Sequence, residues 1–69
     1  MATYTLWLVN GSGQYPIVQN RELDTAITAL DLAVKRRQSG GWIVIARNAK
    51  RAVLRNGDQA VAFEITEES

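Results

Sequence analysis

The chain has 69 residues, no cysteine, no histidine and a formal net charge of +1. A chain this short is expected to form one domain over residues 1–69, and it buries only about 60% of the surface that its unfolded form exposes. Without cysteine or histidine it lacks disulfides, thiolate ligands, the commonest transition-metal ligand and the usual general base near neutral pH. We therefore expect a non-enzymatic protein with no catalytic, cofactor-binding or metal-binding residues.

The basic residues are segregated along the chain. Seven of the eight lysines and arginines lie within residues 35–55, a stretch that contains no aspartate or glutamate. A segment of this kind attracts an anionic partner. Basic residues at helix ends and edge strands also serve solubility and prevent edge pairing, so both interpretations stay open.

The N-terminal region predicts a strand followed by a turn. Thr3–Val9 is rich in threonine, aromatic and aliphatic residues, which favour a pleated strand. Asn10–Gly13 has turn composition, and we expect a loop to continue past Pro16 with a short extended piece at 17–18. The glycines resemble those of a phosphate-binding loop, but no helix follows directly, so an ordinary turn is favoured.

A helix is predicted from about Glu22 to Gln38. Apolar residues recur there at i, i+3, i+4 and i+7, the spacing of a helix that packs on one side. Asn20 is the predicted N-cap, and Gly40 is the predicted left-handed residue that ends the helix. Lys35–Arg37 complement the negative end of the helix dipole, so these three residues already have a structural explanation.

The C-terminal half predicts three strands. Trp42–Arg47 is a nearly continuous apolar run, typical of a strand covered on both faces. Arg51–Arg55 and Ala60–Ile65 are the next strands, and Asn56–Gly57 between them is a strong hairpin signal. Residues 66–69 form an acidic tail that we expect to be frayed.

The predicted order is β-α-β-β-β, an α+β fold. We expect a two-layer sandwich with one helix packed on one face of a four-stranded mixed sheet. The first two strands should be parallel, either adjacent or one strand apart. In the core, Ile27 and Leu30 should pack against Phe63 and either Leu6 or Leu8.

A single helix covers only one face of such a sheet, although the strands are apolar on both. On the strand after the helix, Ile43, Ile45 and Arg47 should point to one side. An exposed apolar face on a small protein typically marks an interface, and aromatic residues and arginine are enriched at interface centres. The candidate partner-binding residues are Trp7, Arg47, Lys50, Arg51, Val53 and Arg55.

These features favour a small protein-binding module that acts through an open apolar sheet face and a basic hairpin, and that self-associates as a homodimer. In size and composition the chain resembles small phage-encoded or mobile-element accessory proteins that bind and inhibit a host factor; no motif accompanies this resemblance. The alternative is a small DNA- or RNA-binding protein that uses the basic hairpin of residues 47–55 with tryptophan stacking on bases.

The basic residues are expected to form two patches rather than one. The helix end carries Lys35–Arg37, and a strand of about 20 Å separates it from the turn around Lys50. That distance exceeds a Debye length of about 8 Å, which weakens the nucleic-acid hypothesis. No apolar run is long enough to span a bilayer and no secretion signal is recognisable, so we expect no membrane association and a cytoplasmic location.

Overall fold

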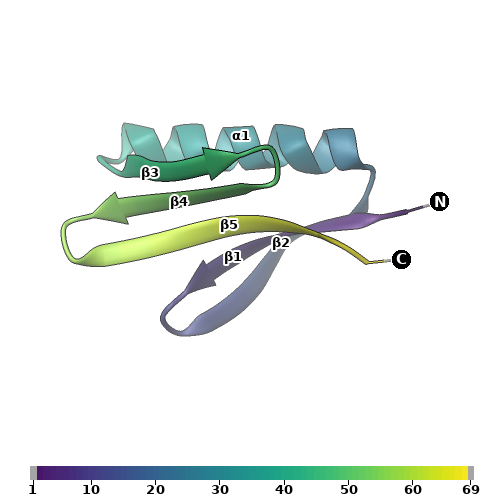
Figure 1. Cartoon of the computed structure of the whole chain (residues 1–69), viewed down its shortest axis with the longest axis horizontal. Helices are drawn as coiled ribbons and strands as arrows, with labels where there is room; N and C mark the ends of the chain where they lie inside the picture. Colours follow the sequence, from purple (N-terminus) through teal and green to yellow (C-terminus); the bar gives the residue numbers. More distant parts are fainter. Residues whose placement is uncertain (1, 69) are drawn as a thin grey trace.

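The computed structural model describes residues 2–68, which form five strands and one helix in two layers (Figure 1). In chain order the elements are β1 Tyr4–Asn10, β2 Gly13–Arg21, α1 Leu23–Ser39, β3 Ile43–Asn48, β4 Arg51–Asn56 and β5 Gln59–Glu67. All the strands belong to one antiparallel sheet with the order β2-β1-β5-β4-β3. The helix packs on one face of this sheet, which confirms the α+β class.

The predicted four-stranded mixed sheet is wrong, because residues 13–21 form a fifth strand, β2, where the sequence predicts a loop with a short extended piece. This strand is polar and contains Pro16, which has no N–H for a sheet ladder. In the structure β2 is an edge strand in which Pro16 lies opposite Trp7, and proline is tolerated at an edge. Since β2 reverses the chain before the helix, β1 and β3 are antiparallel and two strands apart, not parallel neighbours.

The start of α1 also differs from the prediction. Glu22 is the N-cap residue, and its side chain makes no capping hydrogen bond. Asn20, the predicted cap, lies two residues earlier in β2 with a positive φ of 54°. Asparagine tolerates this left-handed conformation better than most residues, so Asn20 serves the turn into the helix rather than its first turn.

The helix ends at a double glycine in a Schellman motif. The amide of Trp42 donates to the Arg37 carbonyl at 3.0 Å, and the amide of Gly41 donates to the Gln38 carbonyl at 3.1 Å. Gly41, with φ 92°, is the left-handed residue, whereas Gly40 has φ −89°. The predicted glycine stop is therefore confirmed, but the left-handed position is one residue later.

The core lies between α1 and the sheet. Its buried apolar members are Leu6, Ala26, Leu30, Val34, Ala52, Leu54, Val61, Phe63 and Ile65. Ile27 and Leu8 are partly buried and pack against this cluster. The predicted contact of the helix residues Ile27 and Leu30 with this part of the sheet is confirmed.

A bulge in β3 changes the direction of one predicted site residue. Val44 pairs with Leu54, but the next pairs are Ala46 with Val53 and Arg47 with Ala52, which leaves Ile45 as an extra residue. Ala52 is buried under the helix, so Arg47 turns to the helix side of the sheet. The expectation that Arg47 shares a side with Ile43 is wrong, because strict alternation ignores the bulge.

The C-terminal residues continue the sheet. β5 extends to Glu67, and the amide of Glu68 donates to the Thr3 carbonyl at 2.8 Å. The predicted acidic tail of residues 66–69 thus overlaps the end of β5, while Ser69 lies outside the described residues. Within residues 2–68, no helix combines the length and apolar character needed to cross a membrane.

Candidate functional site: an open sheet face

The side of the sheet opposite α1 has no second layer within the described chain. Ala52 and Leu54 are buried toward the helix, so the residues that alternate with them point the other way. The same argument applies to the neighbours of Val61 and Phe63 in β5. We call this surface the open face; it comprises Trp7, Val9, Ile43, Ala46, Arg51, Val53, Arg55, Ala60, Ala62 and Glu64.

An apolar band crosses the open face from strand to strand. Val9 lies opposite Ala62, Ala62 opposite Val53, and Val53 opposite Ala46. Trp7 adjoins this band, and its indole Nε1–H donates to the Thr66 hydroxyl at 2.9 Å. This hydrogen bond restrains the ring against the sheet.

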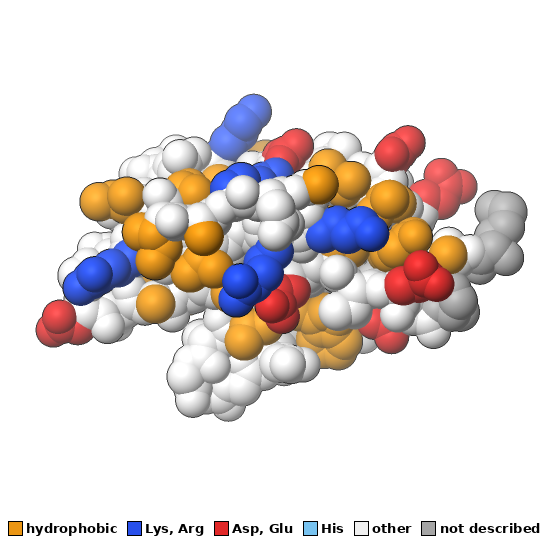
Figure 2. Space-filling model, in the orientation of Figure 1, with side chains coloured by type: hydrophobic (Ala, Val, Ile, Leu, Met, Phe, Trp, Pro, Cys, Tyr) orange, Lys and Arg blue, Asp and Glu red, His pale blue; other side chains and the backbone are white. Residues whose placement is uncertain are grey.

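The most exposed large apolar side chains lie at the β3 end of this surface. Ile43 is 68% exposed and Ile45 is 58% exposed. Together with Arg55 and Gly57 they line a groove with a volume of about 410 Å³. In the space-filling view, hydrophobic and basic side chains alternate over the surface instead of forming separate regions (Figure 2).

The two arginines of the open face are in different electrostatic situations. Arg51 Nε lies 2.8 Å from Glu64 Oε1, and both side chains are partly exposed. Arg55 Nε instead donates to the Gly57 carbonyl at 2.9 Å. Among residues 2–68 no carboxylate forms an ion pair with Arg55, so its charge is not neutralised within the described chain.

The remaining basic site residues lie elsewhere. Arg47 forms an ion pair and a hydrogen bond with Asp31 of α1 on the helix side of the sheet. Lys50, in the β3–β4 turn, has its ammonium group 5.7 Å from the centre of the Tyr4 ring. The structure thus brings Trp7, Val53, Arg51 and Arg55 to the open face, and separates Arg47 and Lys50 from it.

The surroundings of Tyr4 change the acidity of its phenol. Burial raises the pKa of its phenol above the usual value, and the nearby Glu67 carboxylate raises it further. The hydroxyl donates a hydrogen bond to Glu67 Oε1 at 3.3 Å, which stabilises the neutral form. Tyr4 therefore remains uncharged near neutral pH and behaves as a structural side chain.

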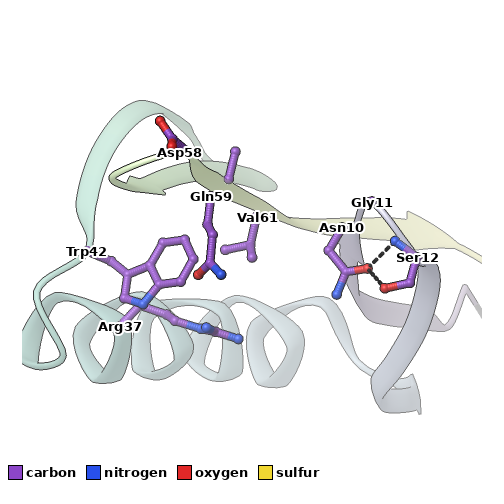
Figure 3. A pocket seen from close by; sticks show the side chains of 9 residues that line it. Asn10, Gly11, Ser12, Arg37, Trp42, Asp58, Gln59 and Val61 are labelled. Carbon is purple, nitrogen blue, oxygen red and sulfur yellow. Dashed lines mark hydrogen bonds between the residues drawn. The ribbon is translucent and has the colours of Figure 1, made fainter.

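The helix end carries a second feature that sequence reasoning missed. The Arg37 guanidinium lies 5.0 Å from the centre of the Trp42 ring and 5.9 Å from that of Phe63. Figure 3 shows Arg37 and Trp42 on one wall of a hollow of about 780 Å³, with Asn10 and Ser12 on the other. The sequence signal for this contact is the spacing of Arg37 and Trp42, five residues apart across the double glycine. A Schellman motif brings those two positions together.

In the turn on the far wall of that hollow, the polar groups of Asn10 and Ser12 form hydrogen bonds with each other. The Asn10 carboxamide oxygen accepts from the Ser12 amide at 2.8 Å and from the Ser12 hydroxyl at 2.9 Å. These bonds stabilise the turn that joins β1 and β2 in a hairpin. The glycines of this segment therefore serve a hairpin turn, as the sequence favoured, and no helix N-terminus adjoins them.

The two basic clusters lie at opposite ends of β3. Figure 1 shows the C-terminal end of α1 beside the start of β3, with the β3–β4 turn at the other end of that strand. Lys35–Arg37 and Lys50 are thus separated by the length of β3, as predicted. Arg47 and Arg51 already have carboxylate partners, so their positive fields are partly neutralised.

Neither metal ligands clustered within the described residues nor similarity to a known protein points to another kind of site. Among residues 2–68 no three aspartate, glutamate, histidine or cysteine side chains gather as metal ligands would. Comparison with known proteins finds no matching family model, no matching curated protein and no matching solved structure.

Proposed function

We propose that the protein is a non-enzymatic module that binds another protein through the open face, acting in the cytoplasm. The observation that carries this proposal is the apolar band of Val9, Ala62, Val53 and Ala46, bordered by Trp7 and by Ile43. One helix cannot cover both faces, and within residues 2–68 nothing else covers this one. Protein interfaces have such apolar centres with aromatic residues and arginine nearby.

The distribution of charge favours a protein over a nucleic acid. Binding to phosphates relies on several unpaired lysines and arginines on one surface. Of the basic residues in the 47–55 hairpin, Arg47 and Arg51 contact Asp31 and Glu64. Arg55 is the basic residue of the open face without such a partner in the described chain, and one unpaired arginine is a weak electrostatic basis for nucleic-acid affinity.

Affinity capture with surface variants tests this proposal. The immobilised protein is exposed to a nuclease-treated lysate of its native host, and bound proteins are quantified. Val53→Glu places a charge at the centre of the open face, and Leu32→Glu is the matched control on the outer side of α1, where Leu32 is 48% exposed. We expect Val53→Glu to reduce capture by more than about tenfold, as for a central interface residue, and Leu32→Glu to leave it unchanged.

Circular dichroism checks that each variant folds. Ala46→Glu, at an exposed position across from Val53, supplies a second open-face variant if Val53→Glu does not fold. A partner that is captured from an untreated lysate but not from the nuclease-treated one contradicts the proposal. So does capture that Leu32→Glu abolishes while both open-face variants retain it.

Self-association is the competing use of the same face. Two copies stacked through their apolar bands form a homodimer, the assembly expected from the sequence. Sedimentation from micromolar to millimolar concentration distinguishes the two uses, because a monomer over that range leaves the open face available to a different protein.

A further inference from the structure

We propose that the free edge of β3 receives an extended segment of the partner protein, which adds a sixth strand to the sheet. This segment carries an apolar residue beside Ile43 and Ile45 and an acidic residue within reach of Arg55. The inference rests on the proposed function and specifies both the binding mode and the chemistry of the partner. Three features of the β3 edge support it.

The first feature is the unpaired backbone. β3 is the last strand of the sheet and pairs with β4 alone. An edge strand presents alternate N–H and C=O groups that can bond to another extended chain. Such strand addition gives affinity through the backbone, and neighbouring pockets give specificity.

The two edges of the sheet differ in how well they accept such a strand. The β2 edge contains Pro16, which has no N–H, and two irregularities in its pairing with β1. β3 has no proline and one irregularity, the bulge at Ile45. Because a bulge bends the strand, we expect the added segment to be short and centred on Ile43 to Ile45.

The second feature is the groove beside this edge. Ile43 and Ile45 form its apolar part, and Arg55 and Gly57 form its other part. The groove therefore lies over β3 and β4 on the open face, next to the free edge. A side chain of an added strand that points toward the open face and leans across β3 can enter it, which shields both isoleucines from water.

The third feature is the charge of the β3–β4 ribbon. This charge favours a segment of a different protein over a second copy of this chain as the added strand. Residues 43–56 contain four basic residues and no acidic residue. Arg47 and Arg51 have carboxylate partners on other elements, which leaves Lys50 and Arg55 as the unpaired charges of the ribbon within residues 2–68. Pairing the β3 edges of two copies would bring these unpaired like charges closer together, and they would repel. An acidic segment of another protein instead meets Arg55, whose guanidinium has no carboxylate partner within residues 2–68.

Titration with two synthetic peptides tests the inference. One probe is a short, end-blocked peptide of alternating valine and glutamate, and the other has lysine at each glutamate position. Amide chemical shifts of the protein are followed by NMR. We expect the acidic peptide to bind about tenfold more tightly than the basic one, with the largest shifts at Ile43–Asn48 and Arg55.

A charge reversal and a matched control make the test specific. Arg55→Glu should reverse the order of the two peptides. Arg21→Glu makes the same change of charge at the opposite edge of the sheet, at an exposed position, and should leave the order unchanged. Equal affinity for both peptides, shifts centred on β2, or β3 shifts that depend on protein concentration without peptide would each overturn the inference.

The result is separable from the proposed function. If Val53→Glu abolishes capture while the peptides bind without preference or away from β3, then the open face binds a protein by side-chain packing and the added strand is rejected. If the peptides bind as expected while Val53→Glu leaves capture unchanged, the edge binds and the proposed role of the whole open face fails.

Discussion

The two faces of the sheet are made by alternate residues of the same strands, yet they differ in what covers them. On the face under α1, Leu54 and Phe63 are almost completely buried. On the open face, Val53 is half-buried while Arg51 and Arg55 are exposed. The covered face holds the core, and the open face keeps apolar area that the helix leaves uncovered.

This difference has a simple geometric origin. A single helix shields one side of a five-stranded sheet, and the chain still places valine, alanine and tryptophan on the other side. Their partial burial stabilises the fold less per residue, because hydrophobic stabilisation scales with the area removed from water. Substitutions that compare equivalent residues on the two sides therefore separate folding from binding.

The largest effect is expected at the centre of the covered face. Leu30→Ala removes a fully buried side chain and should lower the free energy of unfolding by about 2–5 kcal/mol. Leu32→Ala, on the outer side of the same helix, should change it by less than about 0.5 kcal/mol. Urea unfolding measures both, and equal losses would show that the assigned orientation of α1 is wrong.

A binding effect of intermediate size is expected at the β3 edge. The double substitution Ile43→Thr and Ile45→Thr removes two exposed apolar side chains, so the free energy of unfolding should change by less than about 1 kcal/mol. Partner affinity should fall at least about tenfold, equivalent to about 1.4 kcal/mol. Calorimetric titration of the captured partner checks this, and unchanged affinity removes these isoleucines from the interface.

A smaller effect is expected for the ion pair of the open face. Arg51 and Glu64 are both partly exposed, and pairs of this kind contribute about 0.2–1 kcal/mol. A double-mutant cycle of Arg51→Ala and Glu64→Ala should give a coupling energy in that range at low salt. The coupling should weaken as salt is added, and a larger, salt-independent value would mean that this part of the open face is shielded from water.

The smallest effect concerns Tyr4 and appears only at high pH. Its folded pKa is raised, so its contribution to stability is complete below the unfolded value of about 10 and is lost as pH rises through the folded pKa. Between about pH 9 and 11 the free energy of unfolding should therefore fall more steeply with pH for the wild type than for Tyr4→Phe. Parallel curves would show that folding does not perturb this phenol.

The elements with clear periodicity were predictable from the sequence. Apolar spacing identified α1, and the alternation around Val61 and Phe63 identified β5 and its buried face. The pairing of Ile27 and Leu30 with the sheet followed from the same patterns. The excess of apolar residues over what one helix covers also indicated the open face, with Trp7 and Val53 on it.

Other features depend on tertiary context that local patterns do not encode. β2 is polar and contains Pro16, so only pairing with β1 makes it a strand. The bulge at Ile45 leaves no distinct sequence signal, yet it turns Arg47 toward Asp31. Arg51 and Arg55 were predicted as partner-binding residues and lie on the open face, whereas their different partners depend on where Glu64 and Gly57 lie.

Methyl cross-saturation in the complex with the captured partner shows directly whether the partner contacts the open face. In this measurement, saturation of the partner's protons attenuates the signals of those methyl groups that it touches. We expect the strongest attenuation at Val53, Ile43 and Ile45, with Leu32 unaffected. Attenuation centred on Leu32 and the outer side of α1, with the open-face methyl groups unchanged, would contradict it.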